Sequence, residues 1–74
     1  MTAVYIHAPP GFYLAQCHFV GARTWSAIGG RRRSKSSAFA EAGRALACYS
    51  VNRVRVIWCS DWYEPNVVME AARP

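Results

Sequence analysis

The first convincing strand pattern along the chain covers residues 12–20. This stretch is rich in aromatic and β-branched residues, and a period of two predicts a β-strand with one face toward a core. The face expected to meet the core holds Tyr13, Ala15, Cys17 and Phe19. The opposite face holds Phe12, Leu14, Gln16 and His18.

The strongest strand pattern covers residues 53–59, where a β-branched or aromatic residue occupies every second position. These positions are Val54, Val56 and Trp58, and they alternate with Arg53, Arg55, Ile57 and Cys59. A glycine-containing connection at 20–23 predicts a β-hairpin between residues 12–20 and a returning strand at 24–28. Residues 67–72 fit either an edge strand or a helix begun by Pro65, and both readings stay open.

A helical period appears between the two strand regions and runs from Ser36 or Ser37, the expected N-cap, to about Tyr49. The apolar face of this helix is expected to hold Phe39, Ala42, Leu46 and Tyr49. Glu41 and Arg44 are expected outside that face. Gly43 is expected to let the helix lie close against a sheet.

The order hairpin, helix, strand predicts an α+β fold in one domain, residues 1–74, with one helix packed on one face of a small antiparallel sheet. Hydrophobic residues make up 53% of the chain and charged residues 18%, which favours a folded domain over a disordered one. Ten aromatic residues exceed what so small a core requires. Exposed aromatics are therefore expected among Tyr5, Phe12, Tyr13, Trp25, Trp62 and Tyr63.

The formal net charge of +5 is concentrated in the segment from Gly29 to Ser37, which holds four of the nine basic residues and no acid. We expect this segment to be a flexible loop hinged on Gly29 and Gly30 that leads into the helix. Cations at a helix N-terminus oppose the helix dipole, so an anionic partner would offset an unfavourable arrangement. The sequence therefore predicts a basic contact surface.

Nucleic-acid phosphates and an acidic protein surface are both suitable counterparts for such a surface, and a merely solvated loop is the third alternative. Trp62 and Tyr63 lie in a turn and suit either a protein-binding hot spot or a base-stacking platform. The residues predicted to contact a partner or nucleic acid are Arg31, Arg32, Arg33, Lys35, Arg23, Arg53, Arg55, Trp62 and Tyr63.

Other chemistries find little support in the sequence. The basic segment departs from a phosphate-binding P-loop, because Ser34 stands where the glycine before the lysine is needed. Cys17 and His18 point to opposite faces of a strand and cannot easily share a metal or act as a nucleophile pair. We therefore predict no enzyme activity, no metal and no cofactor. Three widely spaced cysteines and the absence of a long apolar run predict a cytoplasmic protein with free thiols and no membrane partner.

This combination of one small sheet-and-helix domain, no catalytic constellation, surplus aromatics and a concentrated basic patch resembles the host-takeover proteins of bacteriophages, including anti-CRISPR proteins. The basic charge departs from the acidic members that mimic DNA, so DNA mimicry is not implied. The resemblance implies a non-enzymatic inhibitor in the bacterial host cell that docks on a protein or nucleoprotein complex. The alternatives are a sequence-nonspecific nucleic-acid-binding accessory protein, and a homodimer formed through the half-apolar sheet face.

Overall fold

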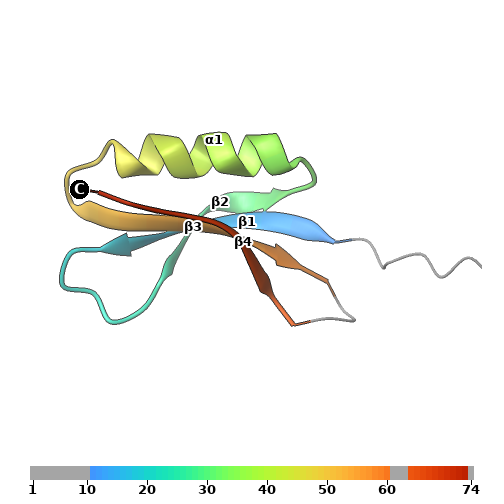
Figure 1. Cartoon of the computed structure of the whole chain (residues 1–74), viewed down its shortest axis with the longest axis horizontal. Helices are drawn as coiled ribbons and strands as arrows, with labels where there is room; N and C mark the ends of the chain where they lie inside the picture. The colour runs from blue at the N-terminus through green and yellow to red at the C-terminus, as the bar shows by residue number, and fades with distance from the viewer. Residues whose placement is uncertain (1–10, 61–63, 74) are drawn as a thin grey trace, which may run out of the picture.

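A four-stranded antiparallel sheet with one helix on one side makes up the fold in the computed structural model, which describes residues 11–60 and 64–73 (Figure 1). The elements are β1 (Phe12–Phe19), β2 (Ser26–Arg32), α1 (Lys35–Leu46), β3 (Val51–Cys59) and β4 (Asn66–Ala72). The strand order is β2-β1-β3-β4. The predicted α+β fold is confirmed, and the open question at residues 67–72 resolves to a strand, paired with β3.

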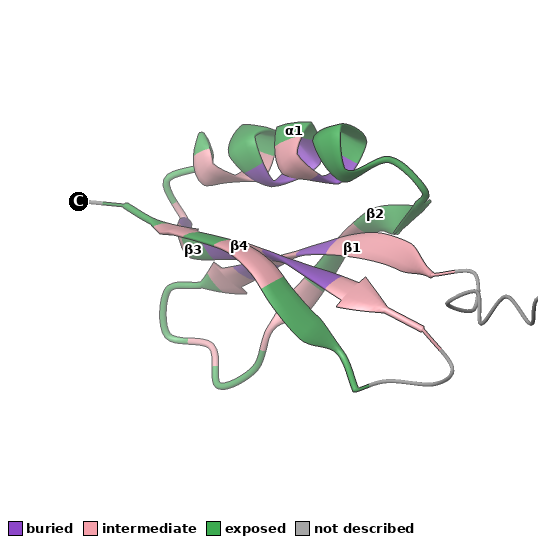
Figure 2. Cartoon of the chain, turned by 45° about the vertical axis from the view of Figure 1, so that its right-hand side comes forward, coloured by how far each residue is buried: buried purple, intermediate pink, exposed green. Residues whose placement is uncertain are grey.

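Small side chains hold α1 against the sheet. Ala38 and Ala42 are completely buried, and they meet a sheet surface that includes Ala15, Val54 and Val56, which are also buried (Figure 2). Side chains no larger than a methyl group let the helix approach closely, and close packing is what stabilises so small a core. Gly43 does not have the predicted role, because it is exposed and a Cβ there would meet only open space.

The helix begins earlier and ends earlier than its sequence pattern predicts. Ser34 is the N-cap, and its hydroxyl accepts a hydrogen bond from the Ser37 backbone N–H at 3.3 Å. At the other end, Arg73 donates hydrogen bonds to the carbonyls of Leu46 and Cys48, which lie at and just beyond the last turn. The placement of Tyr49 on the apolar face was wrong, since this residue follows the helix and is 88% exposed.

The glycine pair does not hinge a loop, because β2 continues through it to Arg32. Ala15 pairs with Ile28 and Tyr13 with Arg32, so β2 has two more residues than β1 between these pairs and must bulge. Gly29 adopts a φ of 62°, which glycine accepts readily. The prediction of a flexible basic loop was wrong: half of its cations, Arg31 and Arg32, are strand residues.

In the part of the chain that the structure describes, one face of the sheet has no helix on it. We call this the open face: the side of the sheet opposite α1, to which Phe12, Leu14, Gln16 and His18 of β1 belong, as predicted. The connection from β1 to β2 curls toward the same side, away from α1 (Figure 1). The open face therefore consists of one sheet surface and a loop that borders it.

Candidate functional site

Trp25 lies at the centre of a cluster of polar and charged side chains on the open face. The Cζ atom of Arg55 lies 4.2 Å from the centroid of the Trp25 ring, and that of Arg53 lies 5.3 Å from it. The His18 ring meets the same indole edge-on, with 5.6 Å between centroids and 65° between planes. Two guanidinium groups and an imidazole thus gather around one indole, and cation–π attraction holds the guanidinium groups there.

Strand pairing explains why these residues meet. Arg55 lies opposite Gln16 in the β1–β3 ladder, and Arg53 lies opposite His18. Paired residues of antiparallel strands point to the same face, so the basic residues of β3 and the polar residues of β1 share the open face. Trp25 reaches them from the β1–β2 connection.

Hydrogen bonds fix the orientation of the cluster. Arg55 donates from Nε to Oε1 of Gln16 at 2.6 Å, and Arg53 forms an ion pair with Glu70 on β4. His18 Nδ1 lies 3.0 Å from Oδ1 of Asn52. Each guanidinium uses part of its donor fork in these contacts and keeps other N–H groups for a ligand. The side chain of Arg53 is 48% exposed.

A second arginine–aromatic stack lies at the other end of β1. The Cζ atom of Arg31 lies 4.7 Å from the centroid of the Phe12 ring. Phe12 belongs to the open face, so Arg31 extends the basic surface along β1. We call Arg31, Arg53 and Arg55, with the rings of Phe12 and Trp25 beneath them, the guanidinium layer.

Arg32 is turned to the helix side of the sheet and does not belong to this layer. Its Nη2 donates to Oε2 of Glu41 at 2.7 Å, and Glu41 is only 7% exposed. This hydrogen bond lowers the pKa of Glu41 and raises that of Arg32, and the attraction between the charges adds to both shifts. The prediction that Glu41 lies away from the packed face was wrong, because the carboxylate is buried against the end of β2.

The other predicted contact residues are dispersed. Lys35 lies over the ring of Phe39 on α1, at 5.8 Å from its centroid, while Arg33 and Arg23 are exposed. Trp62 and Tyr63 lie outside the described residues, as does Tyr5. Of the nine residues predicted to contact a partner, the structure brings Arg31, Arg53 and Arg55 onto one face with aromatic rings.

Sequence reasoning did not place Trp25, His18, Gln16 and Phe12 at the site. Alternation along β1 puts three of them on one face, but it does not say which β3 residues lie opposite them. Trp25 was predicted inside the returning strand at 24–28, but β2 begins at Ser26, so Trp25 lies in the connection, where no period indicates the direction of a side chain. The register of the β1–β3 ladder was the missing information.

No group of three or more His, Cys, Asp or Glu side chains within residues 11–60 and 64–73 is arranged to hold a metal ion. No helix in the described part of the chain is long and apolar enough to cross a membrane. No protein-family model, curated protein or solved structure matches this chain.

Proposed function

We propose that this protein is a non-enzymatic module that binds single-stranded nucleic acid through the guanidinium layer. The observation that carries the proposal is Trp25 flanked by Arg53 and Arg55 on the face that no helix covers. Sites for single strands combine cations that meet the phosphates with flat groups on which bases stack. The guanidinium layer offers both.

The arginines are better prepared for phosphate than free surface arginines. A guanidinium that rests on an aromatic ring has lost part of its freedom before a ligand arrives, so less entropy is lost on binding. Its planar face remains available to a base, and its N–H edge matches the oxygens of a phosphate. Within residues 11–60 and 64–73, Arg31, Arg53 and Arg55 have one carboxylate partner, Glu70, so the layer keeps a positive excess there.

A narrower proposal follows from the resemblance to phage host-takeover proteins. In it, the same surface docks on a bacterial nucleoprotein complex and occludes it. What supports it is the small single-sheet architecture together with a basic face that would meet exposed guide or target strands. Binding to naked nucleic acid is the simpler claim and is tested first.

Fluorescence anisotropy of labelled oligonucleotides tests the proposal. At low salt we expect single-stranded RNA or DNA to bind with a Kd of about 1 to 100 µM, and more tightly than duplex DNA, whose bases are stacked internally. Trp25→Ala should weaken the single-strand affinity about tenfold, because Arg53 and Arg55 lose the ring that orders them before a ligand binds. Tyr49→Ala is the matched control, since this exposed ring follows α1, which packs on the other side of the sheet, and its loss should leave the affinity unchanged.

The proposal fails if anisotropy stays flat up to about 100 µM protein at low salt, the weak limit of nonspecific binding. It also fails if Tyr49→Ala and Trp25→Ala weaken binding equally. If anisotropy stays flat, affinity capture of a partner that nuclease treatment does not reduce would instead favour an acidic protein.

A further inference from the structure

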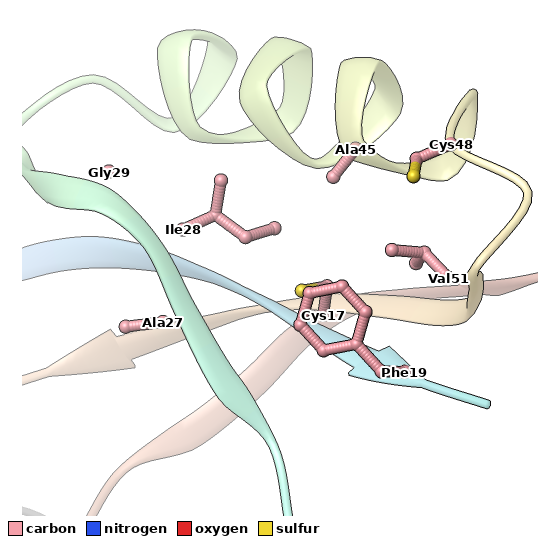
Figure 3. A pocket seen from close by; sticks show the side chains of 8 residues that line it. All are labelled: Cys17, Phe19, Ala27, Ile28, Gly29, Ala45, Cys48 and Val51. Atoms are coloured by element: carbon pink, nitrogen blue, oxygen red, sulfur yellow. The ribbon is translucent and has the colours of Figure 1, made fainter. Parts of the chain in front are cut away.

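A cavity of about 390 Å³ opens between the C-terminal half of α1 and the β1–β2 hairpin (Figure 3). Its lining is mostly apolar and includes Phe19, Ile28, Ala45 and Val51. Two thiols, those of Cys17 and Cys48, also line it. The cavity lies on the helix side of the sheet and is separate from the guanidinium layer.

The two thiols differ in environment. Cys17 is buried, and burial together with the nearby Cys48 raises the pKa of its thiol. Cys48 is exposed, its Sγ lies 3.1 Å from the Ser50 hydroxyl, and the hydrogen bonds from Ser50, aided by the charge of Arg73, lower its pKa. Burial raises the pKa of Cys59, the third cysteine. Cys48 is therefore the thiol best suited to act as a nucleophile.

Arg73 reinforces this difference. Cys48 lies two residues beyond the last residue of α1, where the negative end of the helix dipole opposes a thiolate. The Arg73 guanidinium donates to the carbonyls of Leu46, Cys48 and Val51 and offsets that negative potential.

Apolar surface continues outward from the cavity. Phe19, which lines it, is 40% exposed, and Tyr49, next to Cys48, is 88% exposed. Val20 is 67% exposed, and its N–H donates to the Ser50 carbonyl, which ties it to the same end of the molecule. Three of the four exposed large hydrophobic residues in the described part of the chain thus lie at the end of the molecule that holds Cys48. Such a surface suits a ligand that has a hydrocarbon chain and an electrophilic end.

We propose that Cys48 is an S-acylation site and that the cavity takes up the alkyl chain of the acyl group. The Cys48 thiolate attacks the carbonyl carbon of an acyl thioester, and a new S–C bond forms. The bond from that carbon to the sulfur of the donor breaks, and the donor leaves as a thiolate that takes up the proton released by Cys48. One thioester replaces another, so no oxidant or reductant is required.

Exchange between two thioesters is close to balanced in free energy, so burial of the chain decides the extent of acylation. Each methylene that becomes buried in the cavity should raise the ratio of acylated to free thiol about fourfold. This factor is the equivalent of about 0.8 kcal/mol. The increase should level off once the chain is longer than the cavity.

Intact-mass spectrometry of the full chain, equilibrated with butyryl-, hexanoyl- or octanoyl-coenzyme A, tests the proposal. We expect acylation on Cys48, increasing with chain length, absent in Cys48→Ser and retained in Cys59→Ser. Ala45→Leu narrows the cavity from α1, where the Ala45 side chain points toward Ile28 and Val51 (Figure 3), and should lower octanoylation at least about fivefold while changing butyrylation less. Circular dichroism confirms that each variant is folded.

The proposal is overturned if the acylated fraction is the same for all three chain lengths, or if Cys59 is modified to the same extent as Cys48. An equal loss of octanoylation and butyrylation in folded Ala45→Leu would contradict the role of the cavity. Protein unfolded in urea provides the reference, because its three thiols should react without dependence on chain length.

Discussion

Gly29 and Glu41 show how single residues determine the end of β2. The backbone of Gly29 has a positive φ of 62°, and a Cβ at this position would lie well within 3.0 Å of the Glu41 carboxylate. Glu41 in turn is held by Arg32. The glycine is therefore required both by the backbone conformation and by the space that the buried carboxylate occupies.

Gly29→Ala should destabilise the protein by roughly 2 kcal/mol or more, since alanine at positive φ costs about 1 kcal/mol and Glu41 must also move. Gly30→Ala is the matched control, because a Cβ there meets nothing and the φ is not positive, so its effect should stay within about 0.5 kcal/mol. Urea unfolding measures the change in the free energy of unfolding for both variants. Equal destabilisation by the two variants would contradict the account of the bulge.

Arg32→Ala should destabilise the protein near neutral pH, because it leaves the Glu41 carboxylate buried without its partner. Arg32 lowers the pKa of Glu41 below its usual 4.5, so the stabilisation is complete above pH 4.5 and is lost as the pH falls through the lowered pKa. The difference in melting temperature between wild type and variant should therefore shrink in acid. Arg33→Ala, which removes the neighbouring exposed arginine, should change the melting temperature little at any pH. If the melting temperature of Arg32→Ala differs from that of wild type by the same amount at every pH, the ion-pair explanation is refuted.

At the scale of elements, alternation predicted β1 and β3 well because their inward positions carry β-branched, aromatic or small residues throughout. Propensity alone left β4 undecided, since Val67 and Val68 suit a strand while Pro65 suits the first turn of a helix. Pairing with β3 settled that question, and no local pattern contains the pairing. The predicted start of the helix was shifted because Ser34, Ser36 and Ser37 lie close together and each of them is a suitable N-cap.

Ser34→Ala should cost about 1 kcal/mol of stability, because the Ser34 hydroxyl accepts the hydrogen bond that caps α1. Ser37→Ala should cost less than about 0.5 kcal/mol, since Ser37 contributes its backbone N–H rather than its side chain. Chemical denaturation of the two variants distinguishes these roles. A larger loss for Ser37→Ala would place the cap where the sequence first indicated it.

At the scale of the whole molecule, sequence reasoning identified an excess of arginine and aromatic residues but not their arrangement. Arg53 and Arg55 were placed on the outer side of a strand because Val54 and Val56 point inward. Their meeting with Trp25 depends on the β1–β3 register and on a curled connection, which are properties of the folded chain. The segment richest in cations, from Gly29 to Ser37, does not form one surface. Arg31 and Arg32 lie in β2, Arg32 pairs with Glu41, and Lys35 begins α1.

Two triple variants that remove the same charge test the central claim most directly. One replaces Arg31, Arg53 and Arg55 of the guanidinium layer with glutamine, and the other neutralises Arg33, Lys35 and Arg44, which are exposed and lie outside the layer. The measurement is the affinity for a labelled single strand over a range of salt concentrations. The slope of log K against log salt is about −0.7 for each phosphate contacted.

The account predicts that the layer variant binds at least about tenfold more weakly than wild type and that its salt slope is shallower by about two, the equivalent of three lost phosphate contacts. The second triple variant should keep most of the affinity and slope. Equal losses in the two folded variants would mean that net charge alone attracts the strand, and would contradict a binding site built on the open face.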